Sequence, residues 1–501
     1  MALCRGQGGT PADQPAREWQ NSWQVVAMAA QAGFILSKVH PFNAREAGGY
    51  TCTGYRSQDK PFCIEGALNH IFTQSWHDPH SGTAVSQTEV EGKLVSFLVP
   101  EIFRDKINRG FLDLNSEHPV RTLNEKLLVQ LSKSFPVQEA NSSLPLVFQD
   151  STGSLFSSDG CWMVPVAEEN ADPPSVINKT AKIILPSGFL HWLRTGQGDD
   201  LISGEKDWVF NKYYLRPSML YPLHAVLVQQ TELLPRTLLV LSGLAFRKCK
   251  ISSHDLPVFH ETVFVCVVSQ GSEDACIQCL TENILTVLSP LLQASGFKLD
   301  CTTEEPETPP PNTFLIPEPQ HRNLKYFVTE ALDPSGAEPQ KLCVGTVNAA
   351  SWLPTNISQE CVYASLNLDL LAMQICGIMD WRMLWTSDER FLAQFGGGHL
   401  GPFRSFSLYP PSYAHDISFW VPKAGRFDET QLHAIARCVS GETVVSLRLL
   451  DSFLHPGTGQ TSLCYRITYC SCDQALSEQQ AAAMQMNLRE AVQWSLGLAL
   501  R

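Results

Sequence analysis

The chain has 501 residues, of which 44% are hydrophobic and 17% are charged, and its formal net charge is -13 at pH 7. This length has room for about two to four domains, and the composition is that of a globular protein with a substantial core. The acidic balance excludes a protein that coats nucleic acid non-specifically, because such binding needs cations that meet phosphates. Any contact with RNA must therefore come from a local basic patch.

Cysteine usage and the amino terminus bear on the cellular location. The 16 cysteines show no evident disulfide framework, which favours a reducing compartment and mostly buried thiols. The amino terminus lacks the apolar segment of a secretory signal, and Asp13 and Glu18 weaken an interpretation as a mitochondrial transit peptide. No apolar run approaches the roughly 20 residues that span a bilayer. We expect a cytoplasmic protein without a membrane segment, with nucleolar and mitochondrial locations left open.

The first block, residues 1–104, begins with a helix followed by a strand. Apolar side chains recur there at helical spacing, at Trp23, Val26, Ala27 and Ala30. Gly33 ends the predicted helix, and an extended segment follows at 34–39. Further strands are predicted around 48–56 and 93–100. The block therefore resembles part of an α/β sheet.

The second block, residues 105–404, mixes strands, helices and exposed loops. Prolines and acidic residues at 166–174 and 301–320 predict loops, because proline cannot continue regular structure. Strands are predicted at 237–249 and 257–270. An amphipathic helix is predicted from residue 273 to Gly296.

The third block, residues 405–501, has the clearest pattern. Its predicted elements are a strand at 415–422, a helix at 427–441, strands at 443–453 and 461–471, a helix at 477–497 and a short last strand. Ser477 and Gln480 form the sequence pattern of a capping box at the start of the second helix. The order βαββαβ is that of a ferredoxin-like sandwich.

Strand alternation in this third block predicts which side chains face the two helices. The covered face is predicted to hold Ile417, Phe419, Val421, Val445, Leu447, Leu449, Leu463, Tyr465 and Ile467. The other face is predicted to hold Ser418, Trp420, Ser446, Arg448, Cys464, Arg466 and Thr468. An open sheet face with an aromatic ring and two arginines can stack bases and neutralise phosphates. The alternative is a solvated face whose arginines pair with Asp416 or Asp451.

This third block resembles the ferredoxin-fold anticodon-binding domain at the carboxy end of phenylalanyl-tRNA synthetases. The resemblance rests on the segments "YPPSYAHDISFWVP", "FDE", "LLDSFLHPGTGQTSLCYRITY" and "GLALR". In that family the domain holds the anticodon stem of tRNA(Phe), which implies an RNA-binding surface here. The candidate RNA contacts are Arg448, Arg466, Trp420, Lys423 and Arg426.

Residues 234–265 resemble the second class II motif of the same synthetases, a strand that ends in arginine, a loop and a second strand. The resemblance places Arg247 at the ATP α-phosphate with Lys248 beside it. His254 would be the loop histidine, and "FHE" at 259–261 matches the Phe-His-Gln tripeptide of the family. His260 and Glu261 complete this candidate vestigial nucleotide site.

Several positions in this segment and the next depart from the synthetase pattern. Glu261 replaces a glutamine, and Val263 and Cys249 stand where the family has a glutamate and an aspartate. Residues 343–353, "CVGTVNAASWL", resemble the strand and turn that precede the third motif. These departures weaken any expectation of catalysis.

Residues 363–395 resemble the third motif, which binds ATP in the family. Ser365 and Asn367 stand at its glycine positions, and Leu370 stands at its arginine position. An adenylating site needs close backbone approach and a cation on the triphosphate. We therefore interpret this segment as a buried helix that keeps the packing of the family without its chemistry, and we expect no ATP cofactor.

The first block resembles the last αβ portion of the Rossmann-like domain of rRNA uridine-N3 methyltransferases. The matching residues are Trp23, Ala27, Gly33, Phe42, Gly49 and Tyr50. In such folds the cofactor binds at the first strand-to-helix turn, a part that we interpret as missing from a chain shortened at its amino end. We expect no cofactor for this chain, whereas S-adenosylmethionine is possible in a longer form.

Other candidate sites are weaker. Cys276 and Cys279 have the spacing of half a zinc site but lie in a predicted helix, and His77 and His80 lie in a predicted loop. We expect no metal.

The sequence thus predicts an α/β and α+β multidomain protein with three parts. These are a partial Rossmann-like block, a degenerate synthetase-like antiparallel core and a ferredoxin-like domain. The leading hypothesis is a non-catalytic protein that binds tRNA or rRNA, without DNA or membrane partners. The alternative is an rRNA uridine-N3 methyltransferase in a longer form, and an active phenylalanine-tRNA ligase is the least favoured hypothesis.

Overall fold

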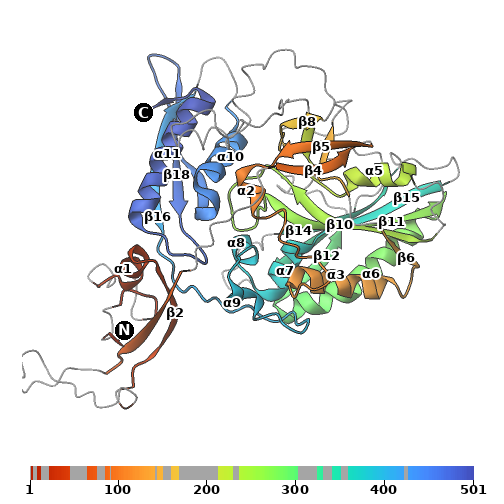
Figure 1. The fold of residues 1–501 in the computed structure, drawn as a ribbon, viewed down its shortest axis with the longest axis horizontal. Helices are drawn as coiled ribbons and strands as arrows, with labels where there is room; N and C mark the ends of the chain where they lie inside the picture. Colours follow the sequence, from red (N-terminus) through yellow and green to blue (C-terminus); the bar gives the residue numbers. More distant parts are fainter. Residues whose placement is uncertain are drawn as a thin grey trace, which may run out of the picture.

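A computed structural model describes most of the chain (Figure 1). The described residues are 2–3, 8–12, 22–43, 45, 65–75, 85–90, 92–140, 144–149, 160–168, 213–229, 236–302, 324–330, 341–350, 359–421 and 427–501. Figure 1 shows a small amino-terminal unit, a large sheet with helices packed on it, and a carboxy-terminal α/β layer. The predicted mixed α/β multidomain fold class is confirmed.

The amino-terminal unit is a three-stranded sheet covered by one helix. Its elements are β1 (Ala2–Leu3), α1 (Val25–Gln31), β2 (Phe34–Pro41) and β3 (Leu68–Gln74), with strand order β1-β3-β2. The predicted helix and strand are confirmed, and Gly33 follows the helix with a φ of 79°. The predicted helix face was wrong at Trp23, which is 55% exposed, because Val25 and Val26 make the contacts with the sheet. The strand predicted at 48–56 lies outside the described residues.

A second small sheet joins the first two sequence blocks. It consists of β4 (Val85–Val90), β5 (Lys93–Leu98) and β8 (Val166–Glu168). The strand predicted near 93–100 is confirmed, but its placement in the amino-terminal sheet was wrong, since β5 pairs with β8 of the middle block. The domain boundary near residue 104 stays a prediction. A two-stranded sheet joins β7 (Val147–Gln149) and β9 (Tyr213–Leu215).

The largest sheet has seven strands in the order β12-β13-β14-β15-β11-β10-β6. The strands are β6 (Val137–Glu139), β10 (Leu238–Phe246), β11 (Val258–Ser269), β12 (Phe297–Thr302), β13 (Leu324–Glu330), β14 (Leu342–Ala350) and β15 (Gln359–Asn367). All neighbouring strands are antiparallel except β6 and β10. Both strands predicted at 237–249 and 257–270 are confirmed as β10 and β11.

Both faces of this sheet are covered, so β10 and β11 are apolar along most of their length. One face packs against α3 (Pro119–Leu131), α6 (Glu273–Ala294) and α7 (Leu368–Cys376). The other packs against the start of α5 (Leu220–Gln229). Short helices α2 (Glu101–Arg104), α8 (Trp381–Leu384) and α9 (Glu389–Leu392) complete the core.

Helix α6 corrects the expectation that no apolar run reaches membrane-spanning length. It has 22 residues, and its length and composition would suffice to cross a bilayer. Its buried side chains belong to the main hydrophobic core, however, and α6 packs on α3, β12 and β14. A core helix of a globular protein passes the same test of length and hydropathy.

The carboxy-terminal domain has the predicted βαββαβ order. Its elements are β16 (Tyr413–Trp420), α10 (Glu429–Ser440), the 3-10 turn η5 (Gly441–Thr443), β17 (Val444–Leu454), β18 (Thr461–Tyr469), α11 (Glu478–Leu496) and β19 (Ala499–Leu500). The strand order is β17-β18-β16-β19 with antiparallel neighbours. Ser477 and Gln480 form the predicted capping box, and Gly441 follows α10 as predicted.

The predicted covered face of this domain is correct on β16 and β18 but wrong at Val445 of β17. Register shifts between Val444 and Ser446 and between Leu449 and Asp451 break the alternation. Each extra residue in one strand moves the following side chains to the other face. Val444 is therefore buried in place of Val445. Leu449 precedes the second shift and shares the predicted face with its partner Tyr465, although its side chain is 46% exposed.

Candidate nucleic-acid interface

The face of the carboxy-terminal sheet that lies opposite α10 and α11 is called the open face here. Cross-strand partners share a face of a sheet, so the register defines its rows. One row joins Asp416, Arg466 and Arg448 across β16, β18 and β17. Another joins Trp420, Ser462 and Phe453. The candidate residues Arg448, Arg466 and Trp420 thus lie on one surface, as predicted.

Arg466 is bound by a carboxylate on the neighbouring strand. Its Nε and Nη2 donate to Asp416 Oδ1 and Oδ2 at 2.8 and 2.9 Å. This bidentate bond with the guanidinium lowers the pKa of Asp416. The alternative prediction, in which the arginines of this face pair with Asp416 or Asp451, is therefore confirmed for Arg466.

Arg448 differs from its neighbour. It stands directly opposite Arg466 in the β17–β18 register and is exposed. Within the part of the chain that the structure describes, no carboxylate lies at ion-pair distance from Arg448. Asp416 already offsets the charge of Arg466 in this row. Arg448 is therefore the guanidinium of the pair that can neutralise a phosphate.

An aromatic cluster at the far end of the open face was missed by the sequence analysis. The ring centroids of Trp420 and Phe453 lie 6.5 Å apart, and His455 lies 5.9 Å from Trp420 and 6.3 Å from Phe453. Arg501 places its guanidinium carbon 5.7 Å from the Trp420 centroid and 5.5 Å from that of Phe453. The irregularity after Leu449 turns Phe453 to this face. Regular alternation gave no signal for this placement.

The turn that carries His455 orients its ring. The backbone N–H groups of Gly457 and Thr458 both lie 3.1 Å from His455 Nδ1, which accepts from them. A neutral imidazole with Nδ1 as acceptor carries its proton on Nε2. The cluster therefore combines three aromatic rings and one guanidinium group. Lys423 and Arg426, the other candidate RNA contacts, lie outside the described residues.

The residues predicted to form a vestigial nucleotide site lie on or just after strands of the seven-stranded sheet, and they bond within the chain. The Ser365 hydroxyl donates to Glu261 Oε1, and the Met219 N–H donates to Glu261 Oε2. Ser365 and Glu261 are two of the positions that depart from the synthetase pattern. They are buried and bond to each other across β11 and β15.

The two buried arginines beside Glu261 also bond within the chain. Arg247 Nε donates to the Pro217 carbonyl at 2.9 Å, and Arg216 Nε donates to the Leu244 carbonyl at 2.7 Å. Burial lowers the pKa of Arg247 and lowers that of Arg216 to about 10, while Glu261 acts in the opposite direction on both. Lys248 lies over the Trp162 ring at 5.9 Å.

His260 is held by a carboxylate at the start of α7. Its N–H and its Nδ1 both lie 3.0 Å from Asp369 Oδ1, and Trp385 Nε1 donates to Asp369 Oδ2 at 2.8 Å. Asn367 accepts from the Leu370 N–H and caps α7, while Leu370 is fully buried. The segment first interpreted as helix is a strand up to Asn367, so Ser365 lies on β15.

The candidate metal ligands do not come together in the described part of the chain. Cys276 and Cys279 lie in α6, and no group of three His, Cys, Asp or Glu side chains suited to a metal occurs among the described residues. His77 and His80 lie outside them.

Comparison with known proteins agrees with the fold of the carboxy-terminal domain. The model of the ferredoxin-fold anticodon binding domain matches residues 407–501. Ferredoxin-fold anticodon-binding domain-containing protein 1 of Homo sapiens is 41% identical over 510 residues, which cover 99% of this chain and 80% of that protein. Its Mus musculus homolog is also 41% identical, over 514 residues that cover 100% of this chain and 80% of the homolog.

A phenylalanine-tRNA ligase also matches. The chloroplastic/mitochondrial enzyme of Arabidopsis thaliana is 29% identical over 297 residues, which cover 58% of this chain and 65% of the enzyme. Because it is 41% identical to the human and mouse proteins over nearly all of its own length and 80% of theirs, the chain belongs to the family of ferredoxin-fold anticodon-binding domain-containing protein 1.

Proposed function

We propose that this protein binds tRNA through the open face of its carboxy-terminal domain. The observation that carries the proposal is the exposed Arg448 opposite Arg466, on the same surface as the cluster of Trp420, Phe453 and Arg501. The matched domain is named for anticodon binding, and several relatives are phenylalanine-tRNA ligases. These names support tRNA as the first RNA to test, with rRNA as the alternative.

Each part of the surface has a distinct task in the proposed complex. Arg448 neutralises a phosphate, a contribution that weakens as salt rises because counterions compete. Phe453 is 40% exposed and offers a face on which a base stacks, a contact worth about 1–3 kcal/mol per base. The Asp416 carboxylate keeps Arg466 in place and limits its share of the phosphate contact.

Charge reversal at one position tests the proposal. We expect Arg448→Glu to weaken binding of a tRNA transcript by about tenfold or more at low salt, and to reduce the salt slope by about one. Electrophoretic mobility shift across a salt series measures both quantities. Arg489→Glu on α11, in the helix layer opposite the open face, is the matched control, since it makes the same change of charge. Equal losses in the two variants, or no retention of tRNA by the unmodified protein, would overturn the proposal.

We further infer that the synthetase-like core does not activate phenylalanine. Two observations support this inference. Ser365 and Glu261 are buried and bond to each other. Leu370 is fully buried and stands where the family has the arginine that meets the triphosphate, so this position supplies no cation. Phenylalanine-dependent exchange of pyrophosphate with ATP tests it, and exchange above a no-enzyme control would refute it. Methylation of rRNA by a longer form stays a prediction.

The location of the protein also stays open to test. The matched phenylalanine-tRNA ligases of Saccharomyces cerevisiae and Mus musculus are named as mitochondrial. We propose cell fractionation to distinguish a cytoplasmic from a mitochondrial location. Protection of the protein from protease inside isolated mitochondria would reject the cytoplasmic location.

A further inference from the structure

The carboxy-terminal domain is joined to the core by buried hydrogen bonds from α10. The Ile251 N–H donates to His433 Nδ1 at 3.0 Å. Arg437 Nη2 donates to the carbonyls of Lys250 and Asp255 at 2.7 and 3.4 Å. Both His433 and Arg437 are almost completely buried. The loop 249–255 of the core thus shares its backbone polar groups with the domain.

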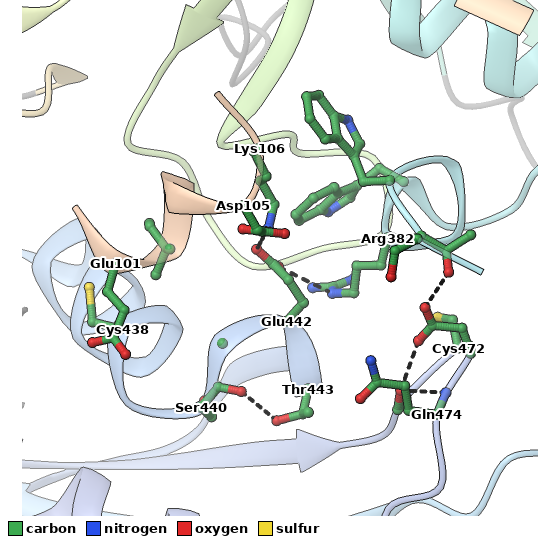
Figure 2. A pocket seen from close by; sticks show the side chains of 18 of the residues that line it. Glu101, Asp105, Lys106, Arg382, Cys438, Ser440, Glu442, Thr443, Cys472 and Gln474 are labelled. Atoms are coloured by element: carbon green, nitrogen blue, oxygen red, sulfur yellow. Dashed lines mark hydrogen bonds and ion pairs between the residues drawn. The ribbon is translucent and has the colours of Figure 1, made fainter. Parts of the chain in front are cut away.

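A cluster of charges beside these bonds also crosses the boundary. Glu442, just after α10, lies 3.5 Å from Lys106 and 3.8 Å from Arg382, which both belong to the core, and 3.9 Å from Arg437. Arg382 Nη2 donates to the Val444 carbonyl at 2.8 Å. These groups line or adjoin a cavity of about 480 Å³ between the core and the domain, and Figure 2 shows Lys106 and Arg382 directed toward Glu442.

Separation of the domain from the core would break this arrangement. Arg437 is 2% exposed and would lose its hydrogen bonds to the carbonyls of Lys250 and Asp255. Lys106 and Arg382 would lose Glu442 but would keep Asp105 and Asp380 as partners within the core. The docked arrangement is therefore stabilised by several buried polar contacts together.

RNA binding does not require that separation. The docking contacts come from α10 and the turn after it, which lie in the helix layer of the domain (Figure 1). Arg448, Trp420 and Phe453 lie on the opposite side of the sheet. The surface that would bind RNA is thus accessible while the domain stays docked.

We propose that RNA is bound with the carboxy-terminal domain fixed to the core, so that both act as one rigid body. The proposal rests on the tRNA binding proposed above. It assigns His433, Arg437 and Glu442 a positioning role, since they set the orientation of the open face and touch no RNA.

A covalent clamp on the native contact tests the proposal. Lys250 Nζ and Glu429 Oε2 lie 3.0 Å apart across the boundary, and the Lys250 side chain is 62% exposed. A carbodiimide activates the carboxyl, and attack by the amine then forms an amide while the reagent leaves as its urea. Mass spectrometry of peptides identifies the clamped product, which is purified and titrated with tRNA.

Lys250→Arg is the matched control, because arginine keeps the charge and forms no amide under these conditions. We expect clamped protein and identically treated Lys250→Arg to bind tRNA within about twofold of each other. A tenfold or larger loss confined to the clamped protein would show that the domain must leave the core, and would overturn the proposal. Failure of the untreated protein to bind tRNA would instead refute the proposed function.

Hydrogen exchange gives a second test that needs no variant or clamp. The Ile251 amide bonds to His433 across the boundary, so its exchange reports separation. We expect its protection to be unchanged when tRNA is added. Faster exchange of peptides that contain residue 251 in the presence of tRNA would contradict the fixed arrangement.

Discussion

At the scale of single residues, the pair of Ser365 and Glu261 explains how the core tolerates its departures from the synthetase pattern. A glutamate is costly to bury without hydrogen-bond partners, and Glu261 is 3% exposed. Ser365 donates to one of its oxygens and the Met219 N–H donates to the other. A serine at the glycine position thus supplies the donor that the glutamate needs.

This contact predicts the effect of a small truncation. We expect Ser365→Ala to lower the free energy of unfolding by about 1–3 kcal/mol, because Glu261 Oε1 loses its side-chain donor in a buried position. Urea denaturation followed by circular dichroism measures the change. Ser446→Ala on the open face is the control, with an expected change under about 0.5 kcal/mol. A similar change in both variants would show that the contact with Glu261 adds no stability.

At the scale of elements, caps and irregularities in the strands decide where the functional side chains lie. Helix α11 starts at a capping box in which Ser477 Oγ accepts from the Gln480 N–H at 3.2 Å, and Gln480 Oε1 accepts from the Ser477 N–H at 2.9 Å. This helix covers the sheet opposite the open face. On β17 the irregularity after Leu449 places Asp451 and Phe453 on the open face.

The cap of α11 can be tested alone. We expect Ser477→Ala to cost about 1 kcal/mol, since it removes the acceptor for the Gln480 N–H. The melting temperature in a thermal scan should fall by a few degrees at most in a chain of this size. Ser452→Ala, an exposed position on β17, is the control. A loss no larger than that of the control would argue against a contribution from the box.

At the scale of the whole molecule, two buried histidines connect stability to pH. Burial lowers the pKa of His433 to about 4 and that of His118 to about 3, from an ordinary value of 6.5. His433 Nδ1 accepts from the Ile251 N–H, and His118 Nδ1 accepts from the Val120 N–H. Protonation of either Nδ1 would break the bond that it accepts. Both side chains are therefore neutral in the folded protein.

The sign of the pH dependence follows. Because the folded-state pKa lies below the unfolded value, the neutral histidines stabilise the fold fully above about pH 6.5. That stability is lost as the pH falls toward 4, by up to about 1.4 kcal/mol per pH unit for each histidine. Urea midpoints measured between pH 7 and 4.5 test this expectation. His433→Asn, whose side-chain oxygen can accept the same hydrogen bond, should flatten the profile, and an unchanged slope would contradict the assignment.

Much of the fold could be predicted from the sequence because its elements carry local signals. The carboxy-terminal domain shows this best, since alternation in β16 and β18, Gly441 after α10 and the capping box of α11 all act within a few residues. Strand alternation and helical spacing gave wrong burial predictions where packing departs from the regular pattern. The irregularities in β17 buried Val444 in place of Val445, and Trp23 lies exposed just before α1.

The candidate site was predictable only in part. Alternation placed Arg448, Arg466 and Trp420 on one face, which the register confirms. Two features depended on contacts between segments far apart in the chain. One is the bond between Arg466 and Asp416, and the other is the cluster of Phe453, His455 and Arg501 around Trp420. Whether these side chains bind RNA stays a prediction.

By itself, the sequence determined the element order of the carboxy-terminal domain and the cap of α11, because propensity, capping and alternation act over short distances. Tertiary structure alone decided that Ser365 satisfies Glu261 across 104 residues, that Arg448 faces Arg466, and that α10 docks on the loop 249–255. Hydrogen bonds and ion pairs act over a few ångströms in space, so their partners are known only once the strands and helices have taken their places.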